Sequence, residues 1–357
     1  MLNSNVWLKN CVLMVITVII TGIVSDEANS AQDIKYSKPD TSEVNIYSAR
    51  KEALIKPLLD KFTEQTGVKV NLVTGKADAL LKRLTSEGMN SPADILLTTD
   101  AGRLHRAKVA GVTQKIQSKK LESAIPSRYR DPEGHWVGLS LRLRPILYVK
   151  DKVDPAEISS YEDLADPKWK GRICIRSSGN IYNQSLVASM IAANGEAATE
   201  QWAKGFVGNF ARAPKGGDRD QIKAAAAGQC DIAIANTYYL AGMLKSSEQS
   251  QVTAAQKIAV FWPNQKTRGA HVNVSGAVLI RSSKNRDNAI ELLEFLAGEK
   301  AQQWYAETNS EFPARENVAV SEMLKAWGEF KADPLILSRL GELNTKAVML
   351  MDRVGWK

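Results

Sequence analysis

The chain has 357 residues, of which 44% are hydrophobic and 24% are charged, and it carries a formal net charge of +8. One hydrophobic core rarely supports this length, so we expect two lobes. The basic residues are spread among acids and are not interleaved with exposed aromatics, which argues against a nucleic-acid partner. Three histidines and three cysteines argue against a zinc or copper site.

The N-terminal segment has the features of an export signal. Lys9 precedes the uncharged stretch 11–24, and small and polar residues follow as far as Ala31. This order is typical of a cleaved secretory signal peptide, and the apolar run is short for a membrane span. We therefore expect residues 1–31 to be removed, and a retained N-terminal anchor is the alternative.

Strands and helices then alternate in the way that builds parallel sheets. For the first lobe we predict strands at 43–49, 68–75 and 93–100 and helices at 52–67 and 77–88. The extended run 135–151 is interpreted as a first crossing between lobes and 269–280 as the return crossing. For the second lobe we predict strands at 173–175 and 230–235 and helices at 159–169, 184–193 and 199–211. A helix pair or kinked helix at 285–307 follows the return.

These elements predict a domain division. Lobe 1 is expected to comprise residues 32–141 with 274–318, lobe 2 residues 142–273, and a helical segment, 319–357, is expected to pack on the lobes. Two extended crossings imply a hinge, and therefore a clamshell that can close on a ligand.

Three tyrosines carry the functional signal. Tyr238 and Tyr239 directly follow the apolar run 230–235, and Tyr182 lies in the segment 176–185. Open α/β sheets bind ligands where buried strands end, and a loop there would let both hydroxyls of the pair face a cleft. Three phenolates would neutralise Fe(III), a hard ion that suits oxygen donors. The alternative is three half-buried aromatics with hydrogen-bonded hydroxyls.

Four segments, 165–192, 234–239, 261–265 and 269–280, resemble those of the periplasmic ferric-iron-binding proteins, the solute-binding subunits of ABC-type iron importers, and the similarity extends from about Asn45 to about Pro313. This resemblance implies an α/β, type II periplasmic-binding-protein fold of two doubly wound lobes joined by hinge strands. It implies Fe(III) as the transported ligand, bound by Tyr182, Tyr238 and Tyr239, with carbonate or another small anion. It also implies a monomeric, non-enzymatic protein of the periplasm that delivers iron to a permease and its ATPase at the inner membrane.

One segment departs from the family pattern. Many relatives have His-Tyr or a single Tyr after the opening strand, where this chain has Lys51 and Glu52. Glu52 could supply a carboxylate oxygen, or water and a small anion could complete the coordination. The alternative is that Glu52 is a first-turn helix acid favoured by the helix dipole. Lys51 is not expected to be a ligand, because a protonated ammonium has no lone pair.

Two sets of residues are candidates for binding the anion. Ser177, Ser178 and Asn180 lie at an expected helix start, where backbone N–H groups and hydroxyls can bind anions. Arg142 and Arg144 lie on one face of a crossing strand and offer guanidinium donors. The alternative for the arginines is pairing with acidic side chains at the surface.

Cys174 and Cys230 each lie eight positions before a tyrosine of the site. We expect them to form a disulfide after export, and two buried free thiols are the alternative that their spacing leaves open. His105, His135 and His271 have no metal-ligand spacing and are expected to be structural. Two other functions stay open: a clamshell protein for an oxyanion or another small molecule, and an extracytoplasmic metal-dependent enzyme.

Overall fold

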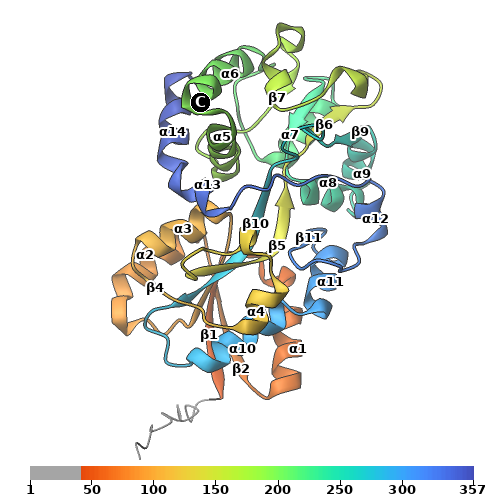
Figure 1. Ribbon diagram of the computed structural model, residues 1–357. Helices are drawn as coiled ribbons and strands as arrows, with labels where there is room; N and C mark the ends of the chain where they lie inside the picture. The colour runs from red at the N-terminus through yellow and green to blue at the C-terminus, as the bar shows by residue number, and fades with distance from the viewer. Residues whose placement is uncertain (1–41) are drawn as a thin grey trace, which may run out of the picture. The chain divides into compact units, whose positions relative to one another are not determined.

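The computed structural model describes residues 42–357, so the predicted signal peptide lies outside the described part. Its strands form two sheets (Figure 1). The first sheet contains β1 (Glu43–Ser48), β2 (Lys69–Thr74), β3 (Ile95–Thr99), β4 (Thr113–Gln114), β5 (Trp136–Leu143), β10 (Val272–Ile280) and β11 (Phe312–Pro313). The second contains β6 (Ile146–Val149), β7 (Ile173–Cys174), β8 (Ile232–Ile234) and β9 (Ile258–Phe261).

The first sheet has the strand order β11-β5-β10-β3-β1-β2, and β4 pairs with β10. β1 pairs in parallel with β2 and β3, as the alternation of strands and helices predicts. β10 runs antiparallel to β3 and β5, so the sheet is mixed and not purely parallel. The return strand causes this difference, because it enters the sheet from the opposite end. All of its residues are buried, which explains its nearly continuous apolar sequence.

The second sheet has the order β7-β8-β6-β9 and is also mixed. The run 135–151 that we interpreted as a crossing divides between the two sheets as β5 and β6, on either side of Arg144 and Pro145. Proline has no N–H to donate to a ladder, which favours a break there. β5 therefore extends two residues beyond the predicted lobe boundary at 141. All second-sheet strands lie within the range 142–273.

Helices cover both sheets. Those that accompany the first sheet are α1 (Lys56–Thr66), α2 (Ala77–Glu87), α3 (Ala101–Val109), α4 (Lys119–Ala124), α10 (Arg286–Leu296) and α11 (Glu299–Glu307). Those that accompany the second are α5 (Ile181–Asn194), α6 (Glu196–Gly208), α7 (Asp218–Ala226), α8 (Thr237–Leu244) and α9 (Gln249–Gln256). The helix predicted at 159–169 is wrong: two short 3-10 helices, Glu162–Ala165 and Pro167–Trp169, occupy this segment. Pro167 forces Asp166 into an extended conformation, which ends the first of them.

The C-terminal helices are α12 (Glu322–Lys325), α13 (Ser338–Glu342) and α14 (Asn344–Arg353). α13 packs against both α3 and α5, and α14 packs against α5 and α6. α13 approaches α3 so closely that a Cβ on Gly341 would lie 2.2 Å from the Cβ of His105. The segment thus contacts helices of both lobes. Among residues 42–357, no helix has the length and apolarity that a membrane crossing requires.

Candidate metal centre

A cleft with a volume of about 640 Å³ lies where loops that follow the strands of the two sheets face each other. The first lobe lines it with residues after β1, β2 and β3 and around β11, and the second lobe lines it with the starts of α5 and α7 and with α8. The side chains most relevant to a ligand are Lys51, Lys76, Arg103, Arg142, Tyr182, Arg219, Tyr238, Tyr239, Lys245 and Glu311. All three predicted tyrosines are therefore brought to one cleft.

Each tyrosine lies in the first turn of a helix. Tyr182 is the second residue of α5, and its backbone N–H donates to the side-chain oxygen of Asn180 over 3.1 Å. Tyr238 and Tyr239 are the second and third residues of α8, whereas a loop was expected after the strand. The positive end of a helix dipole favours negative charge. Both helix starts therefore favour the phenolate form of these side chains.

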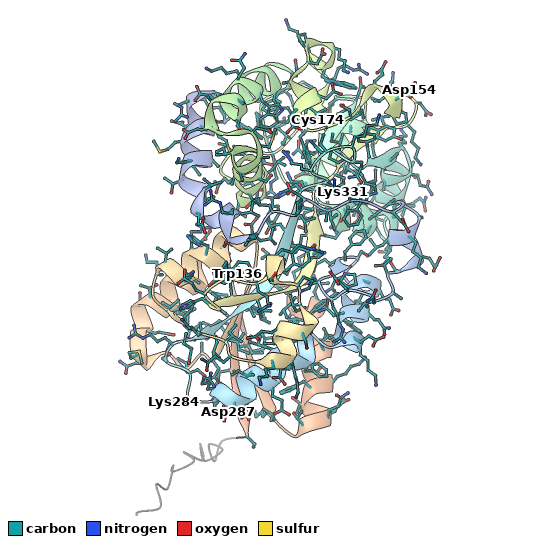
Figure 2. The ribbon with its side chains drawn as sticks, in the orientation of Figure 1. Trp136, Asp154, Cys174, Lys284, Asp287 and Lys331 are labelled. Atoms are coloured by element: carbon teal, nitrogen blue, oxygen red, sulfur yellow. A yellow bond between two sulfur atoms is a disulfide. The ribbon has the colours of Figure 1, made fainter. Side chains whose placement is uncertain are left out.

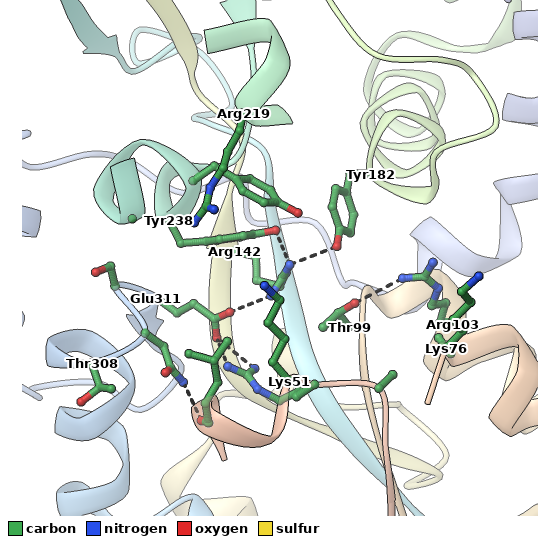
Figure 3. Close-up of a pocket in the computed structure, with 18 of the residues that line it drawn as sticks. Lys51, Lys76, Thr99, Arg103, Arg142, Tyr182, Arg219, Tyr238, Thr308 and Glu311 are labelled. Carbon is green, nitrogen blue, oxygen red and sulfur yellow. Dashed lines mark hydrogen bonds and ion pairs between the residues drawn. The ribbon is translucent and has the colours of Figure 1, made fainter. Parts of the chain in front are cut away.

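Arg142 joins two of the phenols. Its Nη2 donates to the hydroxyl oxygens of Tyr182, over 3.2 Å, and of Tyr238 (Figure 3). The Tyr238 oxygen also accepts from Nδ2 of Asn236 over 2.9 Å. The ring of Tyr239 stacks at a tilt on that of Tyr238, with 4.5 Å between ring centroids. The oxygens of Tyr182 and Tyr238 thus converge on a single positively charged group.

A buried carboxylate holds Arg142 in place. Oε1 of Glu311 accepts from Nη1 of Arg142 over 2.7 Å, and Oε2 accepts from Arg50 over 3.0 and 3.1 Å. Oγ of Ser140 donates to Oε2 of Glu311, and Oγ of Ser275 accepts from Nη1 of Arg142. Sequence reasoning missed Arg50 and Glu311. The one available signal was Arg142 itself, because an arginine in a buried strand needs an acidic partner.

The three phenols differ in acidity. Burial raises the pKa of Tyr182, but the positive charges of Arg142 and Arg103 outweigh this and hold the pKa below its usual value. Burial raises the pKa of Tyr238 well above the usual value, and the attraction of Arg142 offsets only part of this. Burial raises the pKa of Tyr239 to about 12, with a further contribution from the charge of Tyr182. Unless a metal ion binds them, Tyr238 and Tyr239 are therefore protonated at neutral pH.

Arg144, predicted beside Arg142 as an anion contact, lies outside the cleft lining. It is 1% exposed and donates to Asp218, Asn236 and Asn183 over 2.7 to 2.8 Å. These partners belong to or directly precede α7, α8 and α5. Arg144 thus fixes the tyrosine-bearing helices against each other. It pairs with an acid, as in the alternative, but Asp218 is buried and not a surface acid.

The other predicted contacts also lie away from the cleft lining. Ser177 accepts from the N–H of Gly179 over 3.1 Å, Ser178 bonds the C-terminal Lys357 through its backbone N–H, and Asn180 caps α5. They shape the turn before Tyr182. Glu52 is exposed at the start of a 3-10 helix, Glu52–Leu54, as in the alternative that made it a first-turn acid.

Basic side chains dominate the charge of the cleft lining. Seven basic and two acidic residues line it: Arg50, Lys51, Lys76, Arg103, Arg142, Arg219 and Lys245 against Asp78 and Glu311. Glu311 pairs with Arg50 and Arg142, and Asp78 pairs with Arg106. Within the described part of the chain, the other five basic residues of the lining have no carboxylate at ion-pair distance. This field repels a lone trivalent cation and attracts anions.

Cys174 and Cys230 are joined by a disulfide, with 5.9 Å between their Cα atoms. Cys174, labelled in Figure 2, ends β7, and Cys230 precedes β8. These two strands pair in parallel inside the second lobe. The bond therefore links the two strands that lead to α5 and α8.

Among residues 42–357, no group of three His, Cys, Asp or Glu side chains could hold a metal ion.

Comparisons with known proteins identify the family and the fold of the chain. A model of the bacterial extracellular solute-binding protein family matches residues 90–332. Iron uptake protein A1 of Synechocystis sp. is 49% identical over 318 residues, which cover 89% of this chain and 88% of that protein. A Trichodesmium structure in complex with iron and citrate ligands has 51% identity and a TM-score of 0.87, and the match covers 88% of this chain and 100% of that one. The ferric binding protein from Campylobacter jejuni has 40% identity and a TM-score of 0.83, with 88% and 100% covered. The predicted type II periplasmic-binding-protein fold is confirmed.

Proposed function

Because the chain belongs to the family of bacterial extracellular solute-binding proteins, we propose that it captures Fe(III) in its cleft and delivers it to an ABC-type importer of the inner membrane. The observation that carries the proposal is the convergence of Tyr182, Tyr238 and Tyr239 on one cleft. Phenolates are hard oxygen donors, and three of them balance the charge of Fe(III). The only carboxylates in the described cleft lining, Asp78 and Glu311, are already paired with arginines, so the phenols are the oxygen donors best placed to bind the metal.

Iron would replace Arg142 as the positive charge nearest the phenol oxygens. The guanidinium donates to the hydroxyls of Tyr182 and Tyr238. A metal ion bound by the phenolates displaces their protons, since a ligated oxygen donor is deprotonated. Arg142 stays tied to Glu311 and can then donate to the outer side of a phenolate or to a bound anion.

An anion would complete the site. The first-lobe side of the cleft supplies Lys51, Lys76 and Arg103, and the second lobe adds Arg219 and Lys245. Since these cations repel Fe(III), the metal is best admitted together with carbonate or a small carboxylate. The Trichodesmium relative was solved with iron and citrate. We propose such an anion, and not Glu52, as the replacement for the missing first-lobe ligands.

Location and partners follow from the family. Its members are extracytoplasmic solute-binding proteins that work with ABC importers, and the family is not one of enzymes. For this chain we propose export through a cleaved signal peptide, a periplasmic location, and transfer of iron to a permease with its ATPase. The disulfide between Cys174 and Cys230 suits an oxidising compartment.

The test is retention of iron by purified mature protein. After treatment with excess ferric citrate and desalting, we expect about one iron per chain and a red to orange colour from phenolate-to-iron charge transfer. Tyr239→Phe should lose or shift the colour. Tyr148→Phe is the matched control, because Tyr148 lies in β6 outside the cleft lining. Colourless, iron-free wild-type protein would contradict the proposal.

The unpaired cations favour a second candidate, a clamshell protein for an oxyanion or small carboxylate alone. Calorimetry separates the two functions. Binding of citrate or carbonate without iron, unchanged in affinity when iron is added, would favour the second candidate. Anion binding that strengthens when iron is present is the result that iron capture predicts.

A further inference from the structure

Asp100 has an unusual backbone at the corner between β3 and α3. Its φ of 83° and ψ of 127° lie in a region that residues other than glycine rarely adopt, and its side chain is almost fully buried. Such conformations persist only where surrounding contacts impose them, and they concentrate at functional sites. The contacts of Asp100 should therefore indicate which function requires this backbone conformation.

The carboxylate of Asp100 accepts only from uncharged donors. Oδ1 accepts from the backbone N–H of Gly102 over 2.9 Å and from Oγ of Ser185 over 2.7 Å, and Oδ2 accepts from Nδ2 of Asn273 over 2.8 Å. Within the described part of the chain it forms no ion pair. Burial raises the pKa of Asp100, although the hydrogen bonds from Ser185 and Gly102, and then the positive charges of Arg103 and Arg142, offset part of this. Asp100 is the N-cap of α3, which accounts for its hydrogen bond to Gly102 but not for those to Ser185 and Asn273.

The three donors belong to different parts of the molecule. Gly102 is in α3 of the first lobe, Asn273 is in the return strand β10, and Ser185 is in α5 of the second lobe. Asn273 is the cross-strand partner of Arg142 in the β5–β10 ladder. Ser185 lies three residues after Tyr182, on the same side of α5. Asp100 thus connects the first lobe, the hinge and the helix that begins at a proposed iron ligand.

α3 and α5 also approach each other closely beside this carboxylate. A Cβ on Gly102 would lie 3.3 Å from Cδ1 of Ile181, the residue before Tyr182. α13 packs on both helices (Figure 1). This contact joins the lobes at the start of α5. It lies next to the cleft, which Thr99 and Arg103 line on either side of Asp100 in sequence.

We infer that Asp100 is a pivot between the lobes: by holding Ser185, it keeps the start of α5 in place while the lobes close, and so positions Tyr182 for the metal. Asp100 is a positioning residue, since it acts on Tyr182 through α5. The part of this inference that concerns iron rests on the proposed function. The pivot itself is a property of the iron-free protein and can be measured without metal.

Removing the Ser185 hydroxyl tests the pivot, because it breaks the bond between lobes and keeps the contacts of Asp100 within the first lobe. Ser189→Ala is the matched control. Ser189 is buried one turn further along α5, and its hydroxyl donates to the carbonyl of Leu186 within the same helix. Both variants lose one buried serine hydroxyl, so general effects on folding are matched.

Two measurements decide the outcome. Hydrogen exchange of iron-free protein should show faster exchange in the first turn of α5 for Ser185→Ala than for Ser189→Ala. Release of Fe(III) to a competing chelator should be about tenfold faster in Ser185→Ala, as expected for a lost hydrogen bond to a carboxylate, and unchanged within about twofold in Ser189→Ala. The inference is overturned if the two variants match in either measurement. Should wild-type protein bind no iron, the proposed function fails and the exchange measurement alone decides on the pivot.

Discussion

Iron binding should release protons, because the free cleft holds protonated phenols. The pKa of Tyr239 is raised to about 12, so ionising this side chain at pH 7 costs about 5 logarithmic units, or roughly 7 kcal/mol. The pKa of Tyr238 is also well above its usual value of about 10, which adds at least about 3 units. Fe(III) must supply this free energy when it binds.

The dependence on pH follows from the number of protons displaced. Each phenol that is protonated in the free protein and ionised in the complex raises the logarithm of the apparent affinity by one unit per pH unit. Tyr238 and Tyr239 together give a slope of about two. Tyr182 adds at most one more, and its lowered pKa can only reduce that contribution. We therefore expect a slope of two to three between about pH 6 and pH 8.

The assay is competition with a chelator whose own protonation is known, combined with direct titration of released protons in weakly buffered solution. Tyr239→Phe should reduce the slope by about one unit, and Tyr148→Phe should leave it unchanged. A slope near zero after correction for the chelator, or the same slope in Tyr239→Phe, would refute ligation by ionised phenols.

Three further predictions concern stability. Glu311→Gln should lower the free energy of unfolding by about 3 kcal/mol in urea denaturation, because it leaves two buried guanidinium groups uncompensated. The control is Glu316→Gln at an exposed ion pair, which should change this free energy by less than about 0.5 kcal/mol. Equal effects of the two substitutions would argue against the buried network. Denatured, unreduced mature protein should show no free thiol from Cys174 or Cys230, and two titratable thiols would contradict the bond. Cys174→Ala should lower the free energy of unfolding by about 4 kcal/mol, because the disulfide closes a loop with a sequence separation of 56. Burial lowers the pKa of His271 to about 3, so between about pH 6.5 and pH 3 this side chain is protonated in the unfolded chain and neutral in the folded protein. The free energy of unfolding should therefore drop by about 1.4 kcal/mol per pH unit as pH falls through this range. His271→Asn should remove this contribution to the pH dependence.

Much of the site could be predicted from local sequence. The apolar run before Tyr238 and the cap at Asn180 are local patterns, so they indicated where each tyrosine leaves buried structure. Both sheets are nevertheless mixed, because strand direction depends on which end of a sheet the chain enters, and the local pattern does not record that. The pairing of Cys174 with Cys230 likewise depends on the strands being neighbours.

The surroundings of the tyrosines were harder to predict. Arg142 and Arg144 share one face of an extended segment, yet one reaches the cleft and the other is enclosed by Asp218 and two asparagines. Their separation arises because β5 ends between them at Leu143. Glu311 lies far along the chain from the residues that it binds, and no spacing in the sequence connects them.

Resonance Raman spectroscopy of the iron-loaded protein tests the central claim most directly, because excitation within the coloured band enhances vibrations of the groups bound to the metal. We predict tyrosinate ring modes that weaken when Tyr182, Tyr238 or Tyr239 is replaced by phenylalanine. Iron-loaded wild-type protein without tyrosinate modes would contradict the account.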